Sequence, residues 1–246
     1  MIWIAESVCI TKLEIMEGEK MDFYQTIEKR HSVRSFQSYQ LIEEEKKLLK
    51  SKLNHLISIR QDNLLNWKLE ETTQASGRFY AKHEAPPEDY LIEYGFQGEQ
   101  IILSLVEQGF DTLWKAAGIP SDIPAYLIFG KGKGQKTFTE KVMGLFVNAG
   151  NRKDISTFLQ VEPSTLTDSQ RKIIKSCILS PSAINKQPWS FHFQDEKTME
   201  IRISGKSKYN YLDTGICLYH AYQAFAIEYR TPDLIKKGDF HWIVKA

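Results

Sequence analysis

Apolar positions along the chain follow two spacings, one typical of helices and one typical of strands. Apolar residues three and four positions apart predict five helical segments. The first begins at Met21, and the others cover residues 41–49, 101–106, 166–174 and 216–226. Shorter alternating or continuous apolar runs predict six strands. These cover residues 68–70, 79–83, 125–130, 190–195, 199–204 and 240–245. Together the segments predict an α+β fold.

The chain also matches itself, which predicts an internal repeat. Two separate stretches align with later stretches at the same offset of 122 residues. The aligned pairs are residues 30–36 with 152–158, and residues 58–67 with 180–189. Agreement of the offset at both places leads us to interpret the chain as two related halves.

We place the boundary between the halves near residue 150. Residues 21–150 form the first half and residues 151–246 the second half in this interpretation. Residues 1–20 precede the first helical pattern and are interpreted as an N-terminal extension. Two alternatives stay open here: translation that starts at Met21, or a short edge strand over residues 3–13.

A basic triplet in the first half has the chemistry of a phosphate site. Arg30, Ser32 and Arg34 place two guanidinium groups and a hydroxyl at alternate positions, where all three can point at one phosphate. The second copy has Asp154 in place of Ser32 and Ser156 in place of Arg34. A carboxylate there would repel a phosphate, so the second copy has lost this function.

A loop in the second half has the chemistry of a site for a flat polar ligand. Residues 180–189 place small and amide residues between two prolines, which suits a rigid loop whose N–H groups face a ligand. The first copy has Ile59-Arg60-Gln61 in place of Pro181-Ser182-Ala183 and has lost this character. Each half thus keeps one part of a site. A phosphate at one end and a flat heterocycle at the other predict one flavin mononucleotide (FMN) per chain, as in a fused ancestral homodimer.

Composition and charge limit the possible partners. The 246 residues are 42% hydrophobic and carry a net charge of +1, so the chain can bury a sizeable core and has no overall field that would draw it to nucleic acid or a membrane. The three cysteines, Cys9, Cys177 and Cys217, lack metal-ligand spacing, and their odd number argues against a disulfide framework. We expect a cytoplasmic protein without a metal, a signal peptide or a membrane span.

Three motifs in combination carry a family resemblance. They are Arg-x-Ser-x-Arg before Phe36, the Pro-Ser-Ala-x-Asn-x-Gln-Pro-Trp loop, and a Gly-x-x-Thr-x-Trp turn over residues 109–114. The chain resembles the FMN-dependent nitroreductase superfamily and, within it, the single-chain pseudo-dimeric branch called putative TM nitroreductase. The resemblance implies two pseudo-repeats with mostly antiparallel sheets flanked by helices.

The resemblance also implies roles for individual residues. Arg30, Ser32 and Arg34 would hold the FMN phosphate, and the backbone of Lys115-Ala116 would meet the reactive ring nitrogen. The remaining candidates belong to the second half: Pro181, Ser182, Ala183 and Asn185 at the isoalloxazine, with Gln187 in the same loop and Arg152 as part of a basic pair that can add to phosphate binding. One departure is that the family usually has Gly-Gly or Glu-Gly where this chain has Lys115-Ala116.

The implied activity is that of an FMN-dependent oxidoreductase. Hydride would pass from NAD(P)H through FMN to an electron-poor acceptor such as a nitroaromatic or quinone, without an obligatory acid–base side chain. The alternative is a non-catalytic flavin-binding protein that stores FMN or senses redox state. The physiological acceptor and the choice between NADH and NADPH are open at this point. We expect a monomer, because the two halves would already form the interface that a sister enzyme fills with a second subunit.

Overall fold

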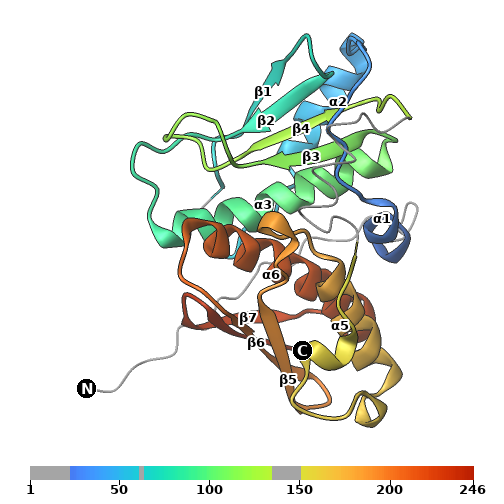
Figure 1. Ribbon diagram of the computed structural model, residues 1–246, viewed down its shortest axis with the longest axis vertical. Coiled ribbons are helices and arrows are strands. Elements are labelled where there is room, and N and C mark those ends of the chain that lie inside the picture. The colour runs from blue at the N-terminus through green and yellow to red at the C-terminus, as the bar shows by residue number, and fades with distance from the viewer. Residues whose placement is uncertain (1–22, 61–63, 135–150) are drawn as a thin grey trace.

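The computed structural model describes residues 23–60, 64–134 and 151–246 (Figure 1). The interpretations of residues 1–20 and of Met21 lie outside this part of the chain. In the described residues no helix is both long enough and apolar enough to cross a membrane.

Two four-stranded antiparallel sheets form the outer layers of the molecule. The first sheet has the order β1-β2-β4-β3, from β1 (Lys68–Glu71), β2 (Gly77–Tyr80), β3 (Asp111–Lys115) and β4 (Tyr126–Gly130). The second has the order β5-β6-β8-β7, from β5 (Trp189–Asp195), β6 (Thr198–Ile203), β7 (Asp233–Gly238) and β8 (His241–Lys245). The same strand order in both sheets is what an internal repeat predicts. Sequence reasoning missed β7, and it described β3 as a turn.

Two long helices lie back to back between the sheets (Figure 1). They are α3 (Glu88–Glu107) and α6 (Lys208–Tyr229). Both begin well before the predicted segments 101–106 and 216–226. Their first turns bury polar residues as well as apolar ones, so these turns lack an apolar period. The remaining helices are α1 (Phe23–Lys29), α2 (Glu43–Leu53) and α5 (Asp168–Leu179), with short 3₁₀ helices η1 (Ile155–Phe158), η2 (Pro163–Thr165) and η3 (Ala183–Asn185).

The central helices cross at a pair of glycines. A Cβ atom on Gly95 would overlap the backbone oxygen of Leu212, and one on Gly215 would overlap the backbone oxygen of Ile92 and approach Phe96 N to 2.6 Å. The contacts are reciprocal between positions 120 residues apart, which is the pattern of a two-fold axis. The two helix backbones therefore touch directly, and α3 and α6 correspond to each other residue by residue.

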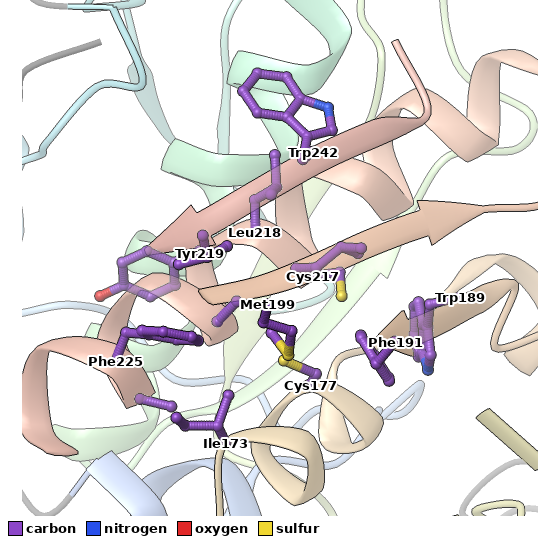
Figure 2. Close-up of a cluster of buried hydrophobic side chains, with 14 of the residues drawn as sticks. Ile173, Cys177, Trp189, Phe191, Met199, Cys217, Leu218, Tyr219, Phe225 and Trp242 are labelled. Atoms are coloured by element: carbon purple, nitrogen blue, oxygen red, sulfur yellow. The ribbon is translucent and has the colours of Figure 1, made fainter. Parts of the chain in front are cut away.

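The larger hydrophobic core lies under the second sheet. Figure 2 shows Cys177 and Cys217 among apolar side chains there, and both cysteines are free and fully buried. They act as small apolar residues in this setting. Phe23 and Ile27 of α1 belong to the same core. The first half therefore sends its N-terminal helix onto the second half.

The aligned segments 30–36 and 152–158 do not occupy equivalent places. Residues 30–36 run beside β3, where the Val33 N–H donates to a β3 carbonyl over 2.9 Å. In the second copy Asp154 accepts the N–H of Ser156 and caps η1. The chain that follows η1 then pairs with β5, at a different sheet edge. The two sheets share one strand order and the two central helices make reciprocal contacts, whereas the segments 30–36 and 152–158 lie in different places.

Candidate functional site

Arg30 is positioned by the packing of α1. The helix ends at Lys29, and its buried Phe23 and Ile27 fix it against the core of the second half. Burial lowers the pKa of the Arg30 guanidinium, and the nearby Glu99 carboxylate opposes that shift. The Arg30 Nε atom is buried and has no hydrogen-bond partner among the residues that the structure describes. A buried donor without an acceptor is costly, so this position suits an anionic ligand.

Arg152 lies beside Arg30. Its Nη1 donates to Asn185 Oδ1 over 2.6 Å, and its Nη2 donates to the Leu179 carbonyl over 2.9 Å. Burial and then the charge of Arg30 lower the pKa of Arg152 to about 10, against the opposing effect of Glu99. The structure therefore brings together one predicted residue from the phosphate triplet and one from the loop, with Arg152 between them.

Ser32 and Arg34 follow on the segment beside β3. Ser32 pairs with Thr112 in an isolated parallel bridge and is exposed, and Arg34 is half-buried. Alternate residues of an extended segment point to the same side. Ser32 and Arg34 are therefore expected on the same side of this segment, which follows the helix end at Arg30.

A buried carboxyl group holds the loop of the second half. Asp213 accepts the N–H of Ala183 over 3.0 Å, and in the first half Glu93, 120 residues earlier, accepts the N–H of Ile59. The two carboxyl groups occupy equivalent places on α6 and α3. Ile59 therefore corresponds to Ala183, whereas the sequence alignment matched it with Pro181. The first loop is two residues longer before its Trp67.

We predict that replacing Asp213 with Asn makes stability less sensitive to pH. Burial raises the pKa of Asp213 from 3.8 to about 7, against the opposing Ala183 N–H. Between these values the folded state holds a proton that the unfolded chain has released, so stability falls as pH rises, by at most about 1.4 kcal/mol per unit, and levels off above the folded pKa. Urea unfolding at about pH 5 and about pH 8 measures this pH dependence. The stability of Asp213→Asn relative to the wild type should be higher at about pH 8 than at about pH 5.

The exposed Asp168 provides the matched control for this prediction. Asp168→Asn should change stability by the same small amount at both pH values. An Asp213→Asn variant whose difference from the wild type is equal at both values would contradict the prediction.

Gln187 is a structural residue of the loop. Its side chain is buried and bonds to the backbone of the preceding segment: Oε1 accepts the N–H of Lys153 over 3.1 Å, and Nε2 donates to the Asn151 carbonyl over 3.1 Å. Its own N–H donates to Ser182 Oγ over 2.9 Å. Gln187 therefore ties the loop to the segment that carries Arg152.

The backbone of this loop is strained. Ile184, Asn185 and Gln187 have φ values of 47°, 55° and 51°, in the left-handed region that disfavours residues with a Cβ. The side chain of Ile184 is 63% exposed. Strain held in place by hydrogen bonds is typical of functional sites. The hydrogen bonds of Gln187 and Asn185 hold the loop in this conformation, with Ile184 at its exposed tip.

The third predicted element is the end of β3. Trp114 donates its indole N–H to Glu99 Oε2 over 2.9 Å, and the indole lies on Gly98, where a Cβ would come within 2.5 Å of the ring. Lys115, which follows, is exposed, and Ala116 is half-buried against the first core. Glu99, which also acts electrostatically on Arg30, thus links the end of β3 to Arg30.

Sequence reasoning missed Glu99 and His220. Both side chains are fully buried, and Glu99 Oε1 lies 3.0 Å from His220 Nε2. No local signal could reveal the pair, because the two residues are 121 positions apart on α3 and α6. In the part of the chain that the structure describes, no group of three or more His, Cys, Asp or Glu residues is placed to hold a metal ion.

Comparison with known families and structures gives the assignment. The family model described as "Putative TM nitroreductase" matches residues 22–225. The chain belongs to this nitroreductase family. A crystal structure of a putative nitroreductase from Thermotoga maritima MSB8 shares 30% identity with the chain, with a TM-score of 0.76, and the match covers 96% of this chain and 99% of that one. No curated protein gives a significant match.

More distant nitroreductase structures match about half of the chain. An FMN-dependent nitroreductase from Clostridium difficile R20291 shares 10% identity over 46% of this chain and 88% of that one, with a TM-score of 0.39. A putative NADH dehydrogenase/NAD(P)H nitroreductase from Bacteroides thetaiotaomicron VPI-5482 shares 13% identity with a TM-score of 0.42, and the match covers 56% of this chain and 96% of that one. The nitroreductase fold and family of this chain rest on the family model and the Thermotoga structure, and membership places the chain among the oxidoreductases.

Proposed function

We propose that this nitroreductase binds FMN and passes hydride from NAD(P)H to an electron-poor acceptor such as a nitroaromatic or quinone. The observation that carries the proposal is the pair of half-buried, neighbouring guanidinium groups of Arg30 and Arg152, together with the buried Arg30 Nε atom, which has no hydrogen-bond partner among the described residues. Two like charges held together in a buried place repel one another unless an anion joins them. A phosphate monoester supplies the charge and the acceptor oxygens.

The residues present fit FMN at its other end as well. The loop around Ala183 and Asn185 is rigid and strained, and it lies next to Arg152 through the bond between Arg152 and Asn185. Bound FMN supplies the hydride chemistry. The chain's own part is to hold the phosphate with Arg30 and Arg152, to place the loop against the ring, and to offer the backbone N–H groups of Lys115-Ala116.

The place that the pseudo-two-fold axis relates to the proposed FMN site supports a single FMN site per chain. A groove of about 600 Å³ lies there, lined by the first loop and the end of β7. Arg60 pairs with Asp89 over 2.7 Å, and Lys236 pairs with Asp89 over 2.5 Å and with Asp239 over 2.7 Å. These positive charges are matched by carboxylates of the protein. We therefore infer one FMN per chain. We also infer a monomer, because the contact between α3 and α6 already joins the two halves within one chain.

The test is flavin content followed by turnover. The purified chain is reconstituted with FMN, the excess is removed, and the released flavin is quantified per chain. We expect about one FMN per chain and oxidation of NADH or NADPH when an acceptor is added. Two FMN per chain would contradict the single site. FMN without turnover would favour the storage or sensing alternative, and no FMN would overturn the proposal.

A further inference from the structure

A polar network is buried where α3, α6, β3 and the end of α1 meet. Glu99 Oε1 lies 3.0 Å from His220 Nε2, and Glu99 Oε2 accepts the indole N–H of Trp114 over 2.9 Å. On its other side, His220 Nδ1 lies 2.8 Å from the Ser176 carbonyl. Glu99 and His220 are fully buried. Glu99 also acts electrostatically on Arg30 and Arg152.

The partners of His220 fix where its protons lie. A carbonyl oxygen can only accept, so His220 Nδ1 must carry a hydrogen and donate it to Ser176. Glu99 Oε1 faces Nε2, so one more proton lies between these two atoms. Glu99 Oε2 also accepts the indole N–H of Trp114, so both carboxyl oxygens face a hydrogen-bond partner, as suits a carboxylate; we therefore assign this proton to Nε2, which makes His220 an imidazolium. The pair then has no net charge.

This neutrality matters for the arginines. An isolated carboxylate at Glu99 would cancel about one positive charge of Arg30 and Arg152. With His220 protonated beside it, both guanidinium charges stay available to a ligand. The other groups close to the pair are Tyr219, whose phenol feels the charge of Glu99, and the ring of Phe23, which packs edge-on against His220 at 5.8 Å.

The network exists on one side of the pseudo-two-fold axis only. At the offset of 120 residues set by the glycine contacts, Glu99 corresponds to Tyr219 and His220 to Gln100. Trp114 is the fourth residue of β3, and the fourth residue of β7 is Lys236. The side of the molecule with the ion-paired groove thus lacks the glutamate, the histidine and the tryptophan that form the network. A general need of the fold would place the network on both sides.

We propose that His220 is a positioning residue for the phosphate clamp: as an imidazolium it neutralises Glu99, so that Glu99 can hold Trp114 without withdrawing Arg30 and Arg152 from a bound phosphate. This inference rests on the proposed function, because the clamp has a ligand only if the site takes FMN.

Three variants of the full chain test the charge balance. His220→Gln keeps a donor for the Ser176 carbonyl but leaves Glu99 without its counter-charge. Glu99→Gln removes the charge and keeps an acceptor for Trp114. We expect His220→Gln to raise the Kd for FMN about tenfold or more, equivalent to about 1.4 kcal/mol. Glu99→Gln should stay within about threefold of the wild type, and the double variant should return to that range.

Riboflavin, which lacks the phosphate, is the matched ligand. Its Kd should be the same for the wild type and His220→Gln, because the ring contacts are unchanged. Equal weakening of riboflavin and FMN would show a general structural defect and overturn the proposal. A double variant as weak as His220→Gln, or a His220→Gln variant that binds FMN like the wild type, would also overturn it.

A measurement without flavin separates this inference from the proposed function. Nitrogen-15 NMR of His220 in the flavin-free wild type should show both ring nitrogens protonated at about pH 7. A neutral His220 ring would overturn the inference even if the wild type binds FMN. Because the measurement uses the wild type alone, it remains decisive if His220→Gln does not fold. A wild type that shows the imidazolium but binds no FMN would overturn the proposed function instead.

Discussion

Changing Gly215 to alanine is expected to destabilise the protein by about 4 kcal/mol or more. The new Cβ would overlap the backbone oxygen of Ile92 and come within 2.6 Å of Phe96 N. Backbone atoms of a packed helix cannot move aside as a flexible side chain can, so α3 and α6 would have to separate along their contact. Urea unfolding followed by circular dichroism measures the loss.

Gly238 provides the control for this substitution. A Cβ there meets only the Cβ of His241 at 3.9 Å, which is ordinary contact, so Gly238→Ala should change stability by less than about 1 kcal/mol. Gly95→Ala should resemble Gly215→Ala, because the contacts are reciprocal. Equal midpoints for Gly215→Ala and the wild type would show that the helices do not meet backbone to backbone.

Changing Arg30 to glutamine is expected to raise the Kd for FMN by about 10- to 150-fold, which corresponds to the loss of about 1.5–3 kcal/mol from a charge-assisted hydrogen bond. Arg152→Gln should also weaken binding, because Arg152 shares the buried site with Arg30. Quenching of flavin fluorescence measures both constants. The exposed neighbour Lys29 gives the matched control, and Lys29→Gln should bind FMN as the wild type does.

The same two substitutions should act differently on the flavin-free protein. Each removes one of two repelling, half-buried charges, so neither is expected to lower the unfolding free energy as much as it weakens FMN binding. If Arg30→Gln left the Kd for FMN unchanged while it destabilised the chain, Arg30 would be a structural residue and the phosphate would lie elsewhere.

The sequence predicted those parts of the fold that have a simple apolar period. The helices near residues 41–49 and 166–174 are confirmed as α2 and α5. In α5 one face is buried and the other is exposed, whereas in α2 only Leu49 is buried. β7 gave no signal, since only Leu234 among its six residues is buried. The first turns of α3 were missed because Glu93, Gln97 and Glu99 are buried there beside apolar residues, which removes the contrast that a pattern needs.

The candidate site likewise has residues that the sequence could predict and residues that it could not. Arg30, Ser32 and the loop at Ala183 could be found because each motif is local in sequence. The hydrogen bond of Arg152 to Asn185 joins two segments of the second half that are distant in sequence, and the charge repulsion between Arg152 and Arg30 depends on how α1 packs over the second half. Asp213 and Glu99 were missed for the same reason, because their partners come from other elements.

The direct backbone contact between α3 and α6 also limits how the molecule can move. Shear between packed helices depends on a layer of side chains that changes rotamer as the helices slide, and at Gly95 and Gly215 there is no such layer. A hinge between the halves would have to break this contact. The distance between Arg30 and the loop at Ala183 is therefore set by the folded framework, so both ends of the candidate site are in place before any ligand arrives.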